Sequence, residues 1–440
     1  MLPLEPNTEA GKPNTRRQLL ASMGAAGVLL AAGVGLPVQA QAAEPVLQTD
    51  TSAWFNVKDF GAGNKRSDDD TPFIQSAINA AAESGGTVYI PPGKYVIRSS
   101  LVMRPKVHLL GAGIHAAVLK AGSANLRMVI SGADVTHYSI QGLTFEGMGA
   151  GSASPVPVVE CGVYAAEAEY VRISNCMFDK INNGIQLIRS KHVSVTGCLF
   201  YFILGTDGAH EGYGVMVEGG SSHKIQTNHF KNVYKHGILL TAGSAYTIVA
   251  NNVLESCKEA AILVASKLVA CSHHLIQGNL ISADGLGDTE TSCTYGIRLK
   301  DRCSFTTVTA NVIARSRSAG ILLDAEEKAG EDRPYGNTVT GNTVNQTLRG
   351  IAILNGDANT VKHNDVRRVD TGVLVDAIGE DSWSYAKQNI VTGNTLIQCH
   401  GSGVRIGSPR CQGSVVFGNT GFDNAVGLQD SGTDTAMTGF

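Results

Sequence analysis

The chain has 440 residues, and its 35 Lys and Arg residues against 38 Asp and Glu residues leave a formal net charge of −3. With only 17% charged residues, the composition lacks the basic surface that nucleic-acid binding requires. The 51 glycines and the low aromatic content of 6% favour many short strands joined by tight turns.

The N-terminal segment has the features of an export signal. Residues 15–20 read Thr-Arg-Arg-Gln-Leu-Leu, an apolar run continues to Leu36, and Ala40-Gln41-Ala42 follows. This order resembles a twin-arginine signal peptide with an A-x-A cleavage site. We therefore predict a signal over residues 1–43 and a secreted or periplasmic mature protein over residues 44–440. An uncleaved membrane anchor is the alternative, because the apolar run would span a bilayer if it were not removed. No other segment is apolar enough to cross a bilayer, so we expect the mature protein to be soluble.

Residues 52–100 are expected to open the fold with a short helix and the first strands. Thr71 is a candidate N-cap and Pro72 suits the first helical position. The apolar face of this helix consists of Ile74, Ala77, Ile78 and Ala81. We expect the helix to cap one end of the fold, and Asp68-Asp69-Asp70 to cap loops rather than bind a metal.

A short motif, Gly-[Ile/Val]-x-[Leu/Val/Ile], recurs through residues 162–424. It starts at Gly184, Gly214, Gly237, Gly296, Gly320, Gly350, Gly372 and Gly403, with Ala261 as a member that lacks the glycine. A small polar residue follows each motif, most often after 14 residues, at Cys176, Cys198, Asn228, Asn251, Asn279, Asn311, Asn342, Asn364, Asn394 and Asn419. A period of about 22 residues without helical periodicity indicates a β-solenoid, for which we expect two strands per coil and a stacked asparagine ladder. We expect the cysteines of the ladder to be stacked core residues and predict no disulfide.

Several stretches together resemble one family. They are the repeated strands, Asn56-Val-Lys-Asp-Phe-Gly-Ala62, and residues 85–95, Gly-Gly-Thr-Val-Tyr-Ile-Pro-Pro-Gly-Lys-Tyr. They resemble the pectate-lyase superfamily of the pectate lyase-3 and glycoside hydrolase family 28-related type. The resemblance implies an all-β fold, a right-handed parallel β-helix forming a single domain over residues 44–440. It implies less about chemistry, because this fold hosts lyases, hydrolases, epimerases and tailspikes.

Insertions into the repeat predict the position of a groove. Residues 202–212 and 282–294 lengthen two coils before their strands, and residues 324–336 and 376–388 lengthen two others after theirs. The first pair would stand roughly 14 Å apart as walls, given about 4.8 Å per coil. Strand alternation turns the following residues outward onto the floor between them: Tyr213, Met216, Glu218, His236, Leu239, Thr241, Leu263, Tyr295, Arg298 and Lys300. Rings and mixed charges on such a floor are typical of a carbohydrate groove.

Two pieces of this floor resemble family 28 motifs, Lys235-His236-Gly237-Ile238 and Arg298-Leu299-Lys300. The catalytic carboxylates of that family are absent, since Asn182-Asn183-Gly184 and Gly212-Tyr213 occupy their positions. Lysine, histidine and arginine side chains in the groove, without a pair of carboxylates, favour β-elimination of a uronate over hydrolysis.

We therefore predict an exported lyase acting on an acidic polysaccharide. Arg298 would neutralise the uronate carboxylate. His236, Lys235 or Lys300 would act as the base, and Tyr213 or Tyr295 would protonate the leaving oxygen. The other predicted substrate contacts are His210, Glu211, Glu218, Asp301 and Asp324.

Other interpretations stay open at this point. A glycosidase could use Asp207, Glu211 and Glu218, or Asp324 and Glu326; an epimerase would share the first step of a lyase; and a non-catalytic protein could bind glycan in the same groove. Arg298 and Lys300 could instead form ion pairs with Glu218, Asp301 and Asp324 across neighbouring strands. We predict no cofactor, because Asp284, Asp288 and the acidic residues near Glu326 indicate solvated loops more than a calcium site.

Overall fold

A computed structural model describes residues 54–64, 68–149, 160–205, 211–282, 293–325, 332–379 and 384–438. The chain divides into two units, residues 1–50 and residues 51–440, and the second contains the whole described fold. The predicted signal, residues 1–43, lies outside the described residues. None of the helices in the described ranges is long and apolar enough to cross a membrane.

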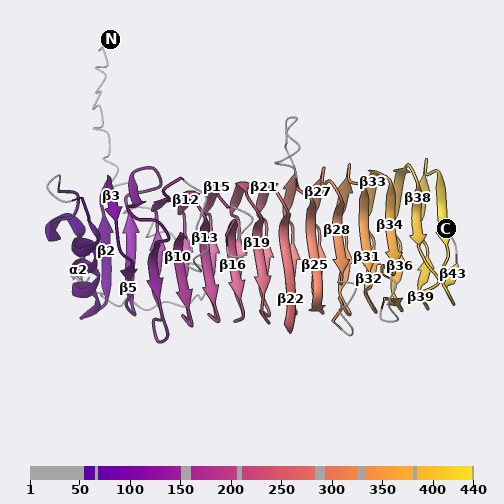
Figure 1. The fold of residues 1–440 in the computed structure, drawn as a ribbon, viewed down its shortest axis with the longest axis horizontal. Coiled ribbons are helices and arrows are strands. Elements are labelled where there is room, and N and C mark those ends of the chain that lie inside the picture. Colours follow the sequence, from indigo (N-terminus) through magenta and orange to yellow (C-terminus); the bar gives the residue numbers. More distant parts are fainter. Residues whose placement is uncertain are drawn as a thin grey trace, which may run out of the picture. The chain divides into compact units, whose positions relative to one another are not determined.

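Three parallel sheets run along the molecule, and each coil adds one strand to each sheet in turn (Figure 1). The predicted right-handed parallel β-helix is thus confirmed. The prediction of two strands per coil was wrong, because a coil has three. The missed strands are short, many of only three residues, and too brief to show an alternating pattern.

The strands are assigned to the sheets as follows. Sheet A consists of β1 (Trp54–Asn56), β2 (Gly86–Ile90), β5 (Val107–Gly111), β8 (Ser139–Gln141), β11 (Arg172–Ser174), β14 (Ser194–Thr196), β17 (Lys224–Gln226), β20 (Ile248–Ala250), β23 (Leu275–Gln277), β26 (Thr307–Thr309), β29 (Thr338–Thr340), β32 (Thr360–Lys362), β36 (Ile390–Thr392), β40 (Val415–Phe417) and β43 (Ala436–Thr438). Sheet B consists of β3 (Gly93–Ile97), β6 (Ala117–Ala121), β9 (Thr144–Glu146), β12 (Met177–Ile181), β15 (Leu199–Ile203), β18 (His229–Val233), β21 (Val253–Cys257), β24 (Leu280–Ser282), β27 (Val312–Ala314), β30 (Thr343–Asn345), β33 (Asp365–Val369), β37 (Thr395–Cys399) and β41 (Thr420–Phe422). Sheet C consists of β4 (Leu101–Val102), β7 (Arg127–Ser131), β10 (Cys161–Ala166), β13 (Asn183–Ile188), β16 (Tyr213–Glu218), β19 (His236–Thr241), β22 (Ala260–Ser272), β25 (Tyr295–Ser304), β28 (Ala319–Asp324), β31 (Arg349–Leu354), β34 (Thr371–Asp376), β38 (Ser402–Ile406) and β42 (Val426–Asp430). Two further strands, β35 (Ala386–Lys387) and β39 (Cys411–Gln412), pair with each other.

The predicted helix is α2 (Thr71–Ala82), and it lies against the first strands at the N-terminal end (Figure 1). The predicted apolar face is buried, which covers the open end of the core. The N-cap position is Asp70 rather than Thr71, because Thr71 is already helical. Asp69 accepts hydrogen bonds from Thr71, and Asp70 accepts them from the backbone of Gly63 and Val96, so these carboxylates cap loops as expected.

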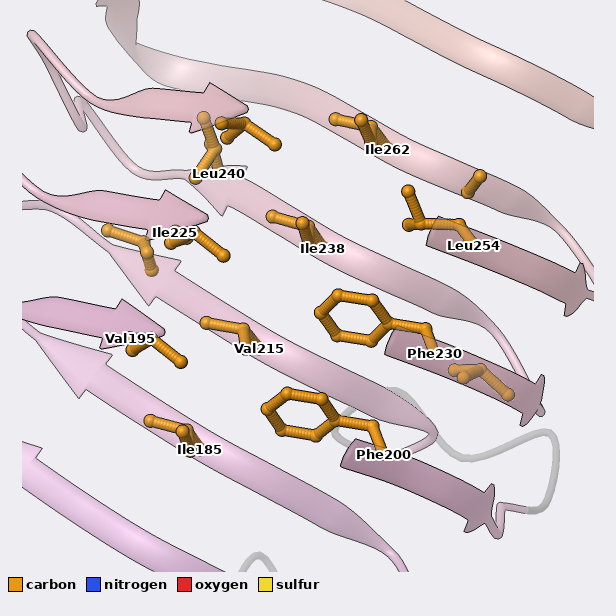
Figure 2. Close-up of a cluster of buried hydrophobic side chains, with 14 of the residues drawn as sticks. Ile185, Val195, Phe200, Val215, Ile225, Phe230, Ile238, Leu240, Leu254 and Ile262 are labelled. Carbon is orange, nitrogen blue, oxygen red and sulfur yellow. The ribbon is translucent and has the colours of Figure 1, made fainter. Parts of the chain in front are cut away.

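The interior is filled by apolar side chains stacked from coil to coil (Figure 2). Phe178, Phe200 and Phe230 on sheet B stack with ring centroids 4.8 and 4.5 Å apart. This stack explains the repeated glycine, because a Cβ on Gly214 would lie 2.6 Å from the ring of Phe230 and 2.6 Å from the carbonyl oxygen of Gly237. Glycine therefore recurs at this position of the sheet C strands, because a side chain there would collide with sheet B or with the backbone of the next coil; Ala261 is the exception.

An asparagine ladder runs between sheets A and B, as the repeat predicts. Each side-chain amide except that of the last member donates to the carboxamide oxygen of the next coil over 2.9 to 3.0 Å, through Asn228, Asn252, Asn279, Asn311, Asn342, Asn364, Asn394 and Asn419. The prediction of Asn251 in this series was wrong, because its neighbour Asn252 makes the ladder bonds while Asn251 adopts a left-handed turn with φ of 55°. Cys198 precedes the ladder, and its backbone N–H donates to Asn228. All nine cysteines lie in described ranges as buried thiols.

Candidate functional site

The outer face of sheet C carries a strip of apolar side chains that is separate from the interior. Met216, Leu239 and Leu263 lie on successive strands of this strip and are only 8 to 9% exposed. Tyr213 and Tyr295 contact the same cluster. The predicted outward orientation of these residues is therefore confirmed, and they form a floor across β16, β19, β22 and β25.

Buried polar side chains gather where these strands begin. Tyr213 and His236 are in register on β16 and β19, and their rings stack with centroids 5.8 Å apart. The ammonium of Lys235 lies 6.0 Å from the centre of the Tyr213 ring. All three side chains are only 7% exposed. Together they form what we call the strand-start cluster, consisting of Tyr213, Lys235 and His236.

The imidazole of His236 is held neutral. Burial, aided by the nearby charges of Lys235 and Arg298, lowers the pKa of His236 to about 3, although the backbone of Ala260 acts in the opposite direction. Its Nε2 lies 3.4 Å from a carboxylate oxygen of Glu259. Its Nδ1 is buried and has no hydrogen-bond partner among the described residues. With Nε2 facing Glu259, the buried Nδ1 is the nitrogen with which this neutral imidazole can accept a proton.

The phenol of Tyr213 is held in its protonated form. Burial and the charges of Glu259 and Glu211 raise the pKa of Tyr213 to about 12. Glu211 is 3% exposed and accepts a hydrogen bond from Asn182 at 3.3 Å. The backbone N–H of Tyr213 donates to Asn183 at 3.1 Å. The cluster thus combines a proton donor and a proton acceptor on neighbouring strands.

The other predicted cation, Arg298, is engaged by a carboxylate of the next coil. Its guanidinium donates two hydrogen bonds to Asp324, over 2.8 and 2.5 Å, and stacks over the ring of Tyr295 at 4.7 Å. Burial acts to lower the pKa of Arg298, but the Asp324 carboxylate outweighs it and raises that pKa above its usual value. Lys300 lies 4.0 Å from Asp301. The ion pairs with Asp324 and Asp301 that the sequence left open are therefore present.

The predicted residues separate into two places on sheet C. Tyr213, His236 and Glu211 lie at the strand starts, while Arg298 and Lys300 lie further along β25. Glu218 ends β16 opposite Thr241 and is half-buried. The remaining predicted loop residues lie outside the described residues: Asp207, His210, Asp284, Asp288 and Glu326.

Sequence reasoning missed the partner of His236. Glu259 precedes Ala260, which is in register with His236. The coil at Ala261 lacks the marker glycine, and aligning it residue by residue with Lys235-His236-Gly237 would have placed Glu259 beside Lys235.

A pocket of 470 Å³ opens beside the strand-start cluster, at the turn from sheet B to sheet C. Phe202, Asn232, Tyr234 and Lys258 are among the residues that line it. The ammonium of Lys258 lies 4.4 Å from the centre of the Tyr234 ring, and Tyr234 directly precedes Lys235. Across the described ranges, no group of three or more His, Cys, Asp or Glu side chains is arranged to hold a metal ion.

Comparison with known proteins gives several matches. Mannuronan C5-epimerase AlgE6 of Azotobacter vinelandii is 34% identical over 116 residues, and alginate lyase 7 of the same organism is 38% identical over 107 residues. These matches span 23% and 21% of this chain but only 13% and 12% of the two relatives.

Solved structures support the fold. The A-module of AlgE6 superposes with a TM-score of 0.56 at 19% identity, over 87% of this chain and 99% of that module. The surface adhesin PfbA of Streptococcus pneumoniae superposes with a TM-score of 0.65 at 18% identity, over 80% of this chain and 91% of the adhesin.

Two family models match the sequence. The model described as periplasmic copper-binding protein (NosD) matches residues 268–398 and 330–437. The model described as rhamnogalacturonase A/epimerase, pectate lyase-like, matches residues 54–279, which are 226 of the 440 residues. By this match, which covers more than half of its length, the chain belongs to the rhamnogalacturonase A/epimerase, pectate lyase-like family.

Proposed function

We propose that this protein is an enzyme that removes the C5 proton from a uronate residue of an acidic polysaccharide. The observation that carries the proposal is the stacked pair of Tyr213 and His236, a protonated phenol beside a neutral imidazole. Proton abstraction next to a carboxylate requires a base, an acid and a positive charge on that carboxylate. The strand-start cluster contains one group suited to each role.

Lys235 is the group that neutralises the uronate carboxylate in this proposal. It lies beside Tyr213 and contributes to the low pKa of His236, so its charge already acts on the base. Arg298 is a less suitable neutraliser than its sequence motif suggests, because Asp324 accepts two of its hydrogen bonds. In this proposal Arg298 binds Asp324 on the neighbouring strand, which stabilises the part of the floor furthest from the cluster, and it adds positive electrostatic potential to the groove.

His236 is the base. Its pKa near 3 makes it a weak base in the free enzyme, but a bound uronate adds a negative charge close to the ring and raises that pKa. The substrate therefore strengthens the base that acts on it. Glu259, 3.4 Å from Nε2, stabilises the imidazolium that forms.

Two outcomes share this first step. In β-elimination, Tyr213 protonates the O4 leaving group; we favour this outcome because the acid and the base lie on the same surface. In C5 epimerisation, a proton returns to the opposite face of C5. Epimerisation is the second candidate, since the similar sequences include a mannuronan C5-epimerase as well as an alginate lyase.

The test is to incubate residues 44–440 with polymannuronate, polyguluronate, polygalacturonate and a neutral glucan. Absorbance of the unsaturated uronate, reducing ends, and the C5 configuration by proton NMR are followed together. Rising absorbance establishes the lyase, and inverted C5 centres without absorbance establish the epimerase. Reducing ends alone would contradict the proposal in favour of hydrolysis, and glycan binding without any product would contradict it in favour of a binding protein.

A further inference from the structure

The corner that joins sheet C to sheet A carries an exposed stack of rings. In each coil the residue after a short β-bridge turns outward at this corner, and the bridges hold successive coils in register. Six ring-bearing residues occupy this position between residues 137 and 305. They are His137, Tyr170, His192, Tyr246, His273 and Phe305.

These residues adopt an unusual backbone conformation for bulky side chains. Their φ angles lie between 50° and 58°, in the left-handed region that glycine and asparagine adopt more readily. The opposite corner, between sheets A and B, uses Asn251 and Gly278 under the same constraint. Tyr170, Tyr246 and Phe305 are nevertheless 51 to 59% exposed.

The stack is interrupted at one coil. Centroids are 4.8 Å apart for His137 and Tyr170, 4.9 Å for Tyr170 and His192, and 5.0 Å for Tyr246 and His273. Between His192 and Tyr246 the corner residue is Ser222, with φ of 62°. Because consecutive coils are about 4.8 Å apart, the facing rings of His192 and Tyr246 lie roughly 10 Å apart. The serine leaves a slot walled by two aromatic faces.

We propose that this slot, formed by His192, Ser222 and Tyr246, binds one pyranose ring of a polysaccharide. The two walls are exposed aromatic faces, and a pyranose ring carries C–H groups on both of its faces. One sugar ring in the slot can therefore pack on both walls at once. Mutual stabilisation of the rings does not account for the serine, because a ring there would join the two stacks into one.

The slot is distinct from the strand-start cluster and does not depend on the proposed catalysis. The cluster lies where the strands of sheet C begin, and the slot lies beyond the point where they end. A second glycan site at that corner would hold the polymer while the floor of sheet C acts on another part of it.

The experiment follows the imidazole signal of His192 by NMR, assigned with His192→Asn, as mannuronate, galacturonate and glucose tetrasaccharides are added. We expect the signal to shift with at least one of these sugars. Ser222→Tyr fills the slot and should weaken that binding at least tenfold. Ser222→Ala keeps the slot open and should bind within twofold of the wild type.

Tyr246→Ala removes one wall and gives a second test should Ser222→Tyr fail to fold; it should also weaken binding at least tenfold. A His192 signal that does not move with any of the sugars would overturn the proposal. Equal binding by Ser222→Tyr, a response to phenol instead of sugar, or self-association that Ser222→Tyr abolishes would also overturn it. Activity on short uronate oligosaccharides, which cannot reach both places at once, should stay unchanged in all these variants, so the slot and the catalytic proposal fail or succeed separately.

Discussion

The asparagine ladder and the strand-start cluster are both rows of buried polar side chains, but they differ in how those groups are satisfied. In the ladder, Asn279 accepts from Asn252 and donates to both Val249 and Asn311 within 3.0 Å. In the cluster, the Nδ1 of His236 has no partner among the described residues, and the pKa values of His236 and Tyr213 are displaced in opposite directions. The ladder groups satisfy one another and so stabilise the fold, whereas the cluster places a neutral imidazole with an unsatisfied nitrogen beside a protonated phenol, which is the combination that proton transfer requires.

The largest expected effect is on His236. His236→Ala should lower the rate of product formation by roughly 10²–10⁴-fold, because it removes the base. Because the substitution also removes a buried ring that stacks on Tyr213, it should lower the thermal unfolding midpoint as well, so the rate is compared per folded molecule. His229→Ala is the matched control, because His229 also lies near a carboxylate, Glu255, but on sheet B. Equal losses of activity in both variants would contradict the role of the cluster.

We expect the ion pair between Arg298 on β25 and Asp324 on β28 to contribute mainly to the stability of the fold. Arg298→Ala leaves the Asp324 carboxylate, 7% exposed, without its guanidinium, and should lower the free energy of unfolding by about 3 kcal/mol. Replacing both partners, as in Arg298→Met with Asp324→Leu, should recover most of that loss. Denaturant unfolding measures both variants. A fully stable Arg298→Ala that has lost activity would instead return Arg298 to the role of substrate neutraliser.

Substitutions in the asparagine ladder should lower the stability of the fold and leave the catalytic rate unchanged. Asn279→Ala leaves Asn252 and Asn311 with unsatisfied groups, so we expect a loss of about 2–3 kcal/mol in the free energy of unfolding. The catalytic rate per folded molecule should be unchanged. Asn251→Gly is the control, since that residue occupies a left-handed turn that glycine tolerates. A lower catalytic rate per folded molecule in Asn279→Ala would contradict the distinction between the asparagine ladder and the strand-start cluster.

The last expected effect appears only as a dependence on pH, and it concerns His223, which, like His274, accepts a backbone N–H in a ladder-like position. His223 accepts the backbone N–H of Val193 at 3.3 Å, as Asn359 accepts that of Asn337 at 3.0 Å. Burial lowers the pKa of His223 to about 4, so the unfolded chain binds its proton first as pH falls from about 6.5 to 4. The free energy of unfolding should therefore decrease as the pH is lowered through that range. His223→Asn should reduce this dependence by up to about 1.4 kcal/mol per pH unit, measured by unfolding between pH 4 and 7. An unchanged slope would contradict the burial of a neutral imidazole.

Much of this architecture follows from local patterns. Strand alternation placed Tyr213, His236 and Arg298 on the outer face of sheet C, and the apolar spacing of residues 74–81 predicted the face of α2 that is buried. The choice between Asn251 and Asn252 could not be predicted, because it depends on which residue takes the left-handed turn. The pairing of Arg298 with Asp324 was one of several possibilities, since it joins different positions of adjacent strands. The displaced pKa values arise from tertiary burial, which no local pattern contains.

The most direct test uses a polyuronate that carries deuterium at C5. Loss of that deuterium to water is followed by NMR as product forms, for the wild type and for His236→Ala. The account predicts one deuterium lost for each residue eliminated or epimerised, and almost no loss with His236→Ala. Product that retains its C5 deuterium would contradict the central claim, because the reaction would then proceed without breaking the C5–H bond.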